Sequence, residues 1–112
     1  MIIREWRGRA EPSKAEAYPD HFRDHVLPQL RRIAGFLGTH LCRRPLDEGI
    51  EFLVLTRWRS IEAIRGFAGD DISKAIVEPA AAAALLDFDA SVQHYEVIEE
   101  ADVSVASAAE PR

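Results

Sequence analysis

An uninterrupted apolar stretch lies at the centre of residues 50–58, and a helical pattern begins about one residue after this segment ends. The stretch consists of Phe52, Leu53, Val54 and Leu55. Ser60 can accept a hydrogen bond from a backbone N–H of the first helical turn, and Glu62 places negative charge at the positive end of the helix dipole. The pattern therefore predicts a strand that ends near Trp58, followed by a helix over residues 60–67.

Between the turn at residues 11–14 and Gly35, apolar residues recur every three or four positions, which is typical of one face of an amphipathic helix. These residues are Tyr18, Phe22, Val26, Leu30 and Ile33. Pro19 and Pro28 lie within the segment, and each removes a helix hydrogen bond, so we predict a kink or a break at one or both. Gly35 is the expected left-handed residue at the end of the helix.

The remaining segments complete an alternating order of strands and helices. Extended patterns cover residues 2–9, 36–44 and 88–99, and residues 45–49 have the composition of a hairpin turn. We predict a short helical piece over residues 72–77 and a further helix over residues 80–86, which contain five consecutive alanines. The resulting order, β-α-β-β-α-β, predicts an α+β, ferredoxin-like fold with a four-stranded antiparallel sheet and its helices on one face.

Residues 52–55 are apolar on both faces of their strand, and this pattern indicates whether the chain associates with a second copy. Helices on one side of the sheet leave the other side uncovered, and an uncovered apolar patch favours association. We therefore predict a homodimer in which two copies pack sheet against sheet to form a shared barrel.

Composition narrows the class of partner. The chain has 112 residues and a formal net charge of −5, which disfavours nucleic acid as a partner. No apolar run approaches the roughly 20 residues that a membrane-spanning helix needs, and the N-terminus has no export signal, so we expect a cytoplasmic protein with no membrane partner. Cys42 is the single cysteine, and we interpret it as a small buried hydrophobic residue.

Four short segments resemble the antibiotic biosynthesis monooxygenase domain family of the dimeric α+β barrel group. They are residues 17–28 with Tyr18, His21 and Pro28, the turn at residues 33–38, residues 56–63 around Trp58, and residues 94–97 with the sequence His-Tyr-Glu-Val. The resemblance extends from residue 2 to residue 99, and we place the domain at residues 1–99. Residues 100–112 then form a C-terminal tail, either flexible or in contact with a partner.

The haem-degrading branch of that family implies a specific set of residues. Its members carry an asparagine on the first strand, a tryptophan in the helix after the third strand and a histidine further on. Phe67 occupies the tryptophan position in this chain, Val77 lies near the histidine position, and the first strand contains no asparagine. We therefore predict no haem and no other cofactor.

The resemblance to cofactor-independent members implies a monooxygenase that acts on an aromatic or quinol-type small molecule. A histidine is the natural base because its pKa lies near neutrality, and the candidates are His21, His25 and His94. The candidates for substrate binding are Tyr18 and Trp58 as aromatic walls and Arg57 or Arg65 as partners of a developing anion.

Each of these residues also has a simpler interpretation. Trp58 and Tyr18 can be packing residues, and His94 can lie at an interface. His21 and His25, one helical turn apart, can be surface residues or can together chelate a divalent metal, although two histidines alone are a weak signal. The alternative function is a non-catalytic dimeric protein that binds a small molecule.

Overall fold

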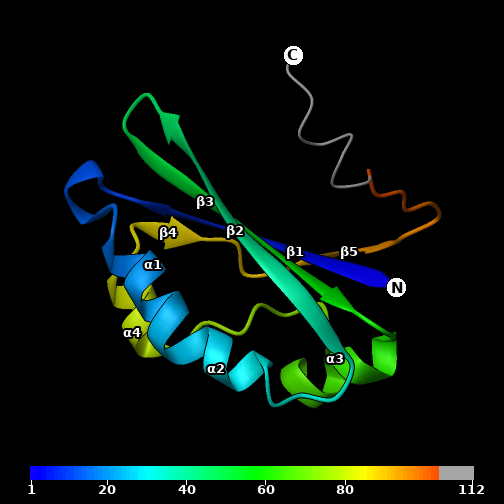
Figure 1. Cartoon of the computed structure of the whole chain (residues 1–112). Coiled ribbons are helices and arrows are strands. Elements are labelled where there is room, and N and C mark those ends of the chain that lie inside the picture. Colours follow the sequence, from blue (N-terminus) through cyan, green and yellow to red (C-terminus); the bar gives the residue numbers. More distant parts are fainter. Residues whose placement is uncertain (104–112) are drawn as a thin grey trace.

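The computed structural model describes residues 1–103, in which an antiparallel sheet carries all its helices on one face (Figure 1). The strands are β1 (Ile2–Ala10), β2 (Phe36–Leu46), β3 (Gly49–Trp58), β4 (Asp87–Phe88) and β5 (Gln93–Glu96). Their order is β2-β3-β1-β4, and β5 pairs with the other end of the β1 edge. This arrangement confirms the predicted α+β, ferredoxin-like fold.

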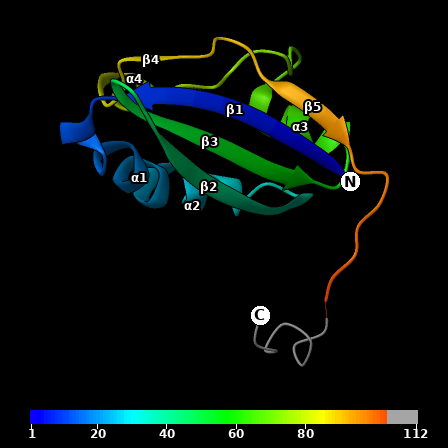
Figure 2. The same cartoon turned by 90° about the horizontal axis from the view of Figure 1, so that it is seen from above.

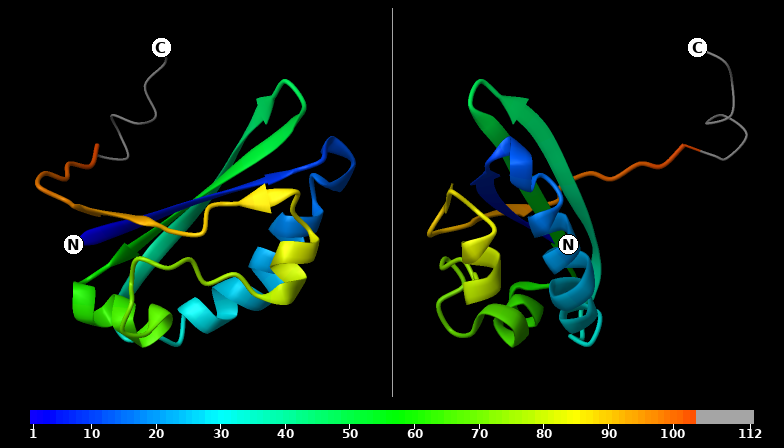
Figure 3. Two further views of the ribbon diagram at one scale, coloured as in Figure 1. Left: turned by 180° about the vertical axis from the view of Figure 1, so that it is seen from behind. Right: turned by 90° about the vertical axis from the view of Figure 1, so that its left-hand side faces the viewer.

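The helical segments all lie against the same side of the sheet, as the views from above and from behind show (Figures 2 and 3). They are η1 (Pro12–Lys14), α1 (Ala17–His21), η2 (Phe22–Val26), α2 (Leu27–Leu30), α3 (Ile61–Ala68) and α4 (Pro79–Ala83). The first four follow β1, whereas α3 and α4 follow β3, so that two helical layers flank a shared core.

The first long helical segment is interrupted by a π-helical turn rather than by a break. Within η2 the backbone N–H of Leu27 donates to the carbonyl of Phe22, five residues earlier. Pro28 follows directly, and its missing N–H and bulky ring disfavour regular α-helical bonding at this point. A spacing of four residues drifts by about 40° per step around a regular α-helix. The wider π-turn offsets part of this drift and keeps the apolar stripe facing the sheet.

The predicted junction between β3 and α3 is confirmed. The Ser60 hydroxyl accepts a hydrogen bond from the backbone N–H of Ala63 at 3.2 Å and so caps the helix. Gly35, before β2, has a φ of +91°, the left-handed conformation that the sequence predicted.

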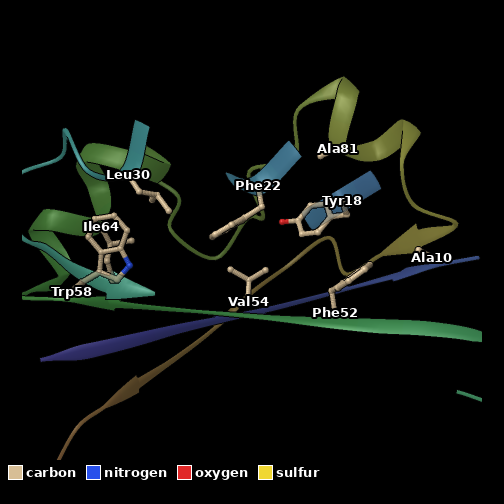
Figure 4. Close-up of a cluster of buried hydrophobic side chains, with 9 residues drawn as sticks. All are labelled: Ala10, Tyr18, Phe22, Leu30, Phe52, Val54, Trp58, Ile64 and Ala81. Atoms are coloured by element: carbon tan, nitrogen blue, oxygen red, sulfur yellow. The ribbon is translucent and has the colours of Figure 1, made fainter. Parts of the chain in front are cut away.

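The core lies between the helical layers and one face of the sheet (Figure 4). β3 directs Phe52, Val54 and Trp58 toward the helices, and its Thr56 accepts a hydrogen bond from the Trp58 indole N–H at 2.8 Å. The largest fully buried side chains are those of Trp58, Phe52, Leu30 and Ile64. Trp58 also packs against Phe36 and Phe67, with ring centroids 5.3 and 5.9 Å apart.

The opposite face of the sheet combines apolar and charged side chains. Leu53 and Leu55 lie there as predicted, each partly exposed in the single chain. Beside them Glu51 forms ion pairs with arginines of both neighbouring strands, Arg7, Arg9 and Arg44. Cys42, paired with Leu53 across the sheet, is exposed in this structure, so the interpretation of it as a buried residue is wrong for the single chain.

Residues 72–77 do not form the predicted helical piece. Asp71 accepts hydrogen bonds from both the backbone N–H and the hydroxyl of Ser73, which favours a turn. The backbone then pairs with the segment before β5 instead of with itself: the Ala75 N–H donates to Ala90, and the Val92 N–H donates to Ser73. These non-local hydrogen bonds replace those of a helix.

The predicted last strand over residues 88–99 is divided into β4 and β5. Between them the chain leaves the sheet, and the Trp6 indole N–H donates to the Asp89 carbonyl at 2.8 Å. Of the predicted tail, residues 104–112 lie outside the described residues. Among the described residues, no helix is long and apolar enough to cross a membrane.

Candidate active site

A cavity lies between the helix-facing side of the sheet and the helical layers, and it leaves about 60 Å³ open to the centres of water molecules. Most of its wall is apolar. The lining residues are Arg4, Trp6, Tyr18, His21, Phe22, Val26, Gln29, Leu30, Val54, Thr56, Phe67, Ile76, Val77, Glu78, Ala81 and Val92. Ile76 is 47% exposed, so this part of the wall reaches the molecular surface.

The size of the cavity limits the ligand that it accommodates. This volume exceeds the roughly 10–15 Å³ that a site needs to hold one water molecule, so the cavity has room for several waters. At about 30 Å³ of liquid per water molecule, that space corresponds to a ligand with a single aromatic ring.

His21 stands out among the lining residues because it is buried and lacks a polar partner. It is the last residue of α1, immediately before the π-turn η2, and the residue is 8% exposed. Its Nε2 has no hydrogen-bond partner within the described part of the chain. π-helical turns occur frequently at functional sites, and an unpartnered buried nitrogen is costly unless a ligand or water satisfies it.

Tyr18 lies one turn before His21, and their ring centroids are 6.3 Å apart. Trp6 and Phe52 also flank the Tyr18 ring, with centroids at 5.7 and 5.4 Å. Burial raises the pKa of the Tyr18 hydroxyl well above its ordinary value, so it stays protonated at neutral pH. Tyr18 therefore offers the cavity an aromatic surface and a neutral hydroxyl.

The other two candidate histidines lie outside the cavity lining. The His25 ring packs against the His21 ring at 5.3 Å, but His25 is exposed. His94, on β5, accepts a hydrogen bond at Nε2 from the Arg4 guanidinium at 2.9 Å. Burial, and secondarily the positive charge of Arg4, lower the pKa of His94 and keep it neutral. The structure thus brings only His21, of the three, into the cavity.

The remaining sequence candidates are also away from the cavity lining. Trp58 is fully buried in the core beside Phe67. Arg57 lies on the opposite face of the sheet, where its guanidinium covers Gly38 of the neighbouring strand. Arg65 is on the outer side of α3 and forms an ion pair with Glu62.

Sequence reasoning missed Arg4, which lines the cavity and is 5% exposed. Arg4 and Trp6 are two residues apart on β1 and therefore share a face, which here is the helix-facing side. This alternation was visible in the sequence, but an arginine on a strand is more often solvent-exposed. Gln29, Thr56 and Glu78 are further polar lining residues without a sequence signal of their own.

The lining does not fit the haem site implied for the haem-degrading branch. Phe67 and Val77, which occupy the expected tryptophan and histidine positions, both line the cavity, and Val77 offers no ligand to an iron. As to metals, no group of three or more His, Cys, Asp or Glu side chains in residues 1–103 is arranged to hold an ion.

The antibiotic biosynthesis monooxygenase family model matches residues 1–79, which is more than half of the chain. The chain therefore belongs to this family. Membership supports a monooxygenase-like role and leaves the substrate undetermined. No curated protein sequence matches the chain.

Solved structures share the fold at low sequence identity. A Bacillus cereus protein named as an antibiotic biosynthesis monooxygenase has a TM-score of 0.66 and 15% identity, with 93% of this chain and 97% of that chain covered. The haem degrader MhuD from Mycobacterium tuberculosis, with two haems in its active site, has a TM-score of 0.57 and 22% identity, with 91% and 100% covered. A monooxygenase from the ActVA-Orf6 gene of Streptomyces coelicolor, in complex with nanaomycin D, has a TM-score of 0.56 and 15% identity, with 92% and 91% covered.

Proposed function

We propose that this protein is a cofactor-independent monooxygenase that oxidises a small quinol-type aromatic molecule with dioxygen, and that His21 is the catalytic base. The observation that carries the proposal is that His21, a residue of the wall of a mostly apolar cavity, has a buried Nε2 with no hydrogen-bond partner among the described residues. No donor within the described residues occupies this nitrogen, so it is available to take a proton from a bound hydroxyl group.

The reaction is balanced with a simple quinol as substrate. His21 Nε2 takes the proton of one hydroxyl, and the electron-rich quinolate transfers electrons to dioxygen and forms a carbon–oxygen bond. The proton held by His21 returns to the peroxide. Loss of water from the hydroperoxide breaks the O–O bond and leaves a new carbonyl, so one oxygen atom enters the product and the other leaves as water.

The apolar wall suits this chemistry. Trp6, Tyr18 and Phe22 offer ring faces for an aromatic substrate, and exclusion of water protects the anion and the peroxide from side reactions. The family membership and the fold shared with a monooxygenase support the same reaction class.

Oxygen uptake with 1,4-hydroquinone, corrected for the uncatalysed rate, tests the proposal. We expect consumption of one dioxygen per quinol, formation of hydroxyquinone and no hydrogen peroxide. His21→Ala should lower kcat by at least about 100-fold, the usual scale for a lost general base. His25→Ala is the matched control, since it removes the neighbouring ring outside the cavity, and it should keep most of the rate.

The assignment of the base would be wrong if His21→Ala kept its rate. It would also be wrong if only His25→Ala or His94→Ala lost the rate. Saturable binding of hydroquinone without turnover would instead favour the alternative of a non-catalytic small-molecule-binding protein.

We also propose that two copies associate through the open face of the sheet, as the resemblance to the dimeric α+β barrel group implies. Leu53 and Leu55 lie on that face, and the buried Nε of Arg57 there has no partner among the described residues. Sedimentation should give a dimer at micromolar concentration and a monomer for Leu53→Lys with Leu55→Lys. The control Leu86→Lys, at an exposed residue outside the sheet, should remain dimeric. A monomeric unmodified protein would refute this assembly.

A further inference from the structure

Arg4 is a buried cation that has no counter-ion in the described part of the chain. It is 5% exposed, and within residues 1–103 it forms no ion pair, whereas Arg7 and Arg9 on the same strand each pair with carboxylates. Burial lowers the pKa of Arg4 to about 10, so the guanidinium is still protonated at neutral pH. Buried charges in proteins are ordinarily paired because desolvation of an unpaired ion is costly.

The partners that Arg4 does have are all neutral. Its Nη1 donates to the Ile72 carbonyl at 2.5 Å and to His94 Nε2 at 2.9 Å, and its Nη2 donates to the Lys74 carbonyl at 2.8 Å. Its Cζ also lies 5.8 Å from the centroid of the Phe67 ring, which shields the charge from water. These contacts fix the guanidinium in place and leave its positive charge uncompensated.

Two donors of the guanidinium have no partner among residues 1–103. A guanidinium has five N–H groups, and the three hydrogen bonds use both of Nη1 and one of Nη2. The Nε–H and the second N–H of Nη2 remain, on adjacent nitrogens. Two such donors match the two oxygens of a carboxylate, or together hold one phenolate oxygen.

Arg4 is also part of the wall of the cavity that contains His21. The rest of that wall is mostly apolar, so a negative charge near Arg4 experiences a strong attraction there. Glu78 lines the cavity too, but it does not pair with Arg4 in the described structure. A bound anion can therefore supply the missing counter-charge.

We propose that Arg4 is the receptor for an anionic oxygen, a carboxylate or a phenolate, of a ligand with a single aromatic ring in this cavity. The ring lies against Trp6, Tyr18 and Phe22. This inference rests on the proposed function in taking the cavity as the substrate site, and it narrows the substrate class to quinols whose phenolate oxygen or carboxylate substituent Arg4 holds.

Calorimetric titration with benzoate and methyl benzoate tests the inference, because the two compounds share a ring and differ in charge. We expect benzoate to bind at least tenfold more tightly than its ester. Arg4→Met should remove that preference, whereas Arg31→Met, at an exposed position on the end of α2, should keep it. In a second arm, 4-nitrophenol absorbance should show preferential binding of the phenolate, which separates the two sources of the anionic oxygen.

Equal binding of benzoate and methyl benzoate, together with no preference for the nitrophenolate, would overturn the inference. So would an unchanged preference in Arg4→Met. If Arg4→Met fails to fold, the comparison of the two compounds on the unmodified protein still decides. Anion binding that depends on Arg4 without oxygen uptake would refute the proposed function alone, and oxygen uptake without anion preference would refute this inference alone.

Discussion

The Arg4 guanidinium donates to His94 Nε2 at 2.9 Å and thereby joins the side chains of two paired strands, β1 and β5. Because arginine can only donate, His94 must be neutral at Nε2 and carry its proton on Nδ1. Protonation of His94 would place two cations against each other. A change of pH that protonates His94 would therefore weaken the contact that holds the Arg4 guanidinium in place.

This contact predicts a stability loss in mild acid. The pKa of His94 is lowered in the folded protein by burial and by Arg4 from its ordinary value of 6.5. Below that value the unfolded chain binds a proton more readily, so His94 contributes stability that is present above pH 6.5 and is lost as the pH falls toward its folded pKa. The melting temperature of the unmodified protein should therefore drop between pH 7 and pH 5 more than that of His94→Gln.

His40→Gln is the matched control for this experiment, because His40 is exposed on β2. It should follow the unmodified protein across the same pH range. Parallel pH curves for His94→Gln and the unmodified protein would contradict the assigned role of His94.

Removal of the α3 cap should destabilise the fold modestly. Ser60→Ala deletes the hydroxyl that accepts from the Ala63 N–H, and the expected cost is about 1 kcal/mol in the free energy of unfolding. Urea denaturation measures this change. Ser13→Ala lies in η1, where no side-chain cap forms for that turn, and should change the free energy by less than about 0.5 kcal/mol.

Two glycines with positive φ allow steric and conformational effects to be separated. Gly35 has a φ of +91°, and an added Cβ would lie far inside contact distance of the Ala63 Cβ, whereas Gly69 has a φ of +80° and open space around it. With a ψ of −162°, Gly69 lies in an extended positive-φ region that is essentially confined to glycine, so Gly69→Ala should cost only this conformation, about 1–3 kcal/mol. Gly35→Ala should cost distinctly more, since α3 must also move. Equal costs in urea denaturation would show that the contact with Ala63 is relieved without penalty.

A larger apolar side chain in the wall should fill the cavity while its polar groups stay unchanged. Ala81, in α4, is buried and lines the cavity, and Ala83 in the same helix is exposed. Ala81→Leu should weaken benzoate binding and hydroquinone turnover at least tenfold, while Ala83→Leu should change neither. Full activity and binding in a folded Ala81→Leu variant would place the ligand elsewhere.

Much of the fold was predictable because its signals are local. The cap at Ser60, the turn at Gly35 and the apolar stripe of residues 18–33 each reflect a preference of the backbone or of one helix face. The segment at residues 72–77 was not predictable in this way. Its hydrogen bonds go to residues 90–92 and to Arg4, and no local pattern encodes such distant partners.

The candidate site was predictable only in part. His21 and His25 both flank the apolar stripe, and their spacing alone does not show which of them points inward. In the structure His21 is buried and His25 is exposed, and the π-turn between them is not evident from composition. Arg4 was missed because an uncompensated buried arginine contradicts the usual placement of charge, which is also the reason why it is informative.

The pairing of β1 with β3 has a consequence for ligand choice. Arg4 pairs with Thr56 and faces the cavity, whereas the next residue, Glu5, pairs with Leu55 and faces away. A slip of β1 by a single position would exchange these faces and could present a carboxylate where the guanidinium now stands. The register of β1 against β3, and not only the identity of its side chains, thus determines the sign of the charge that the cavity presents to a ligand.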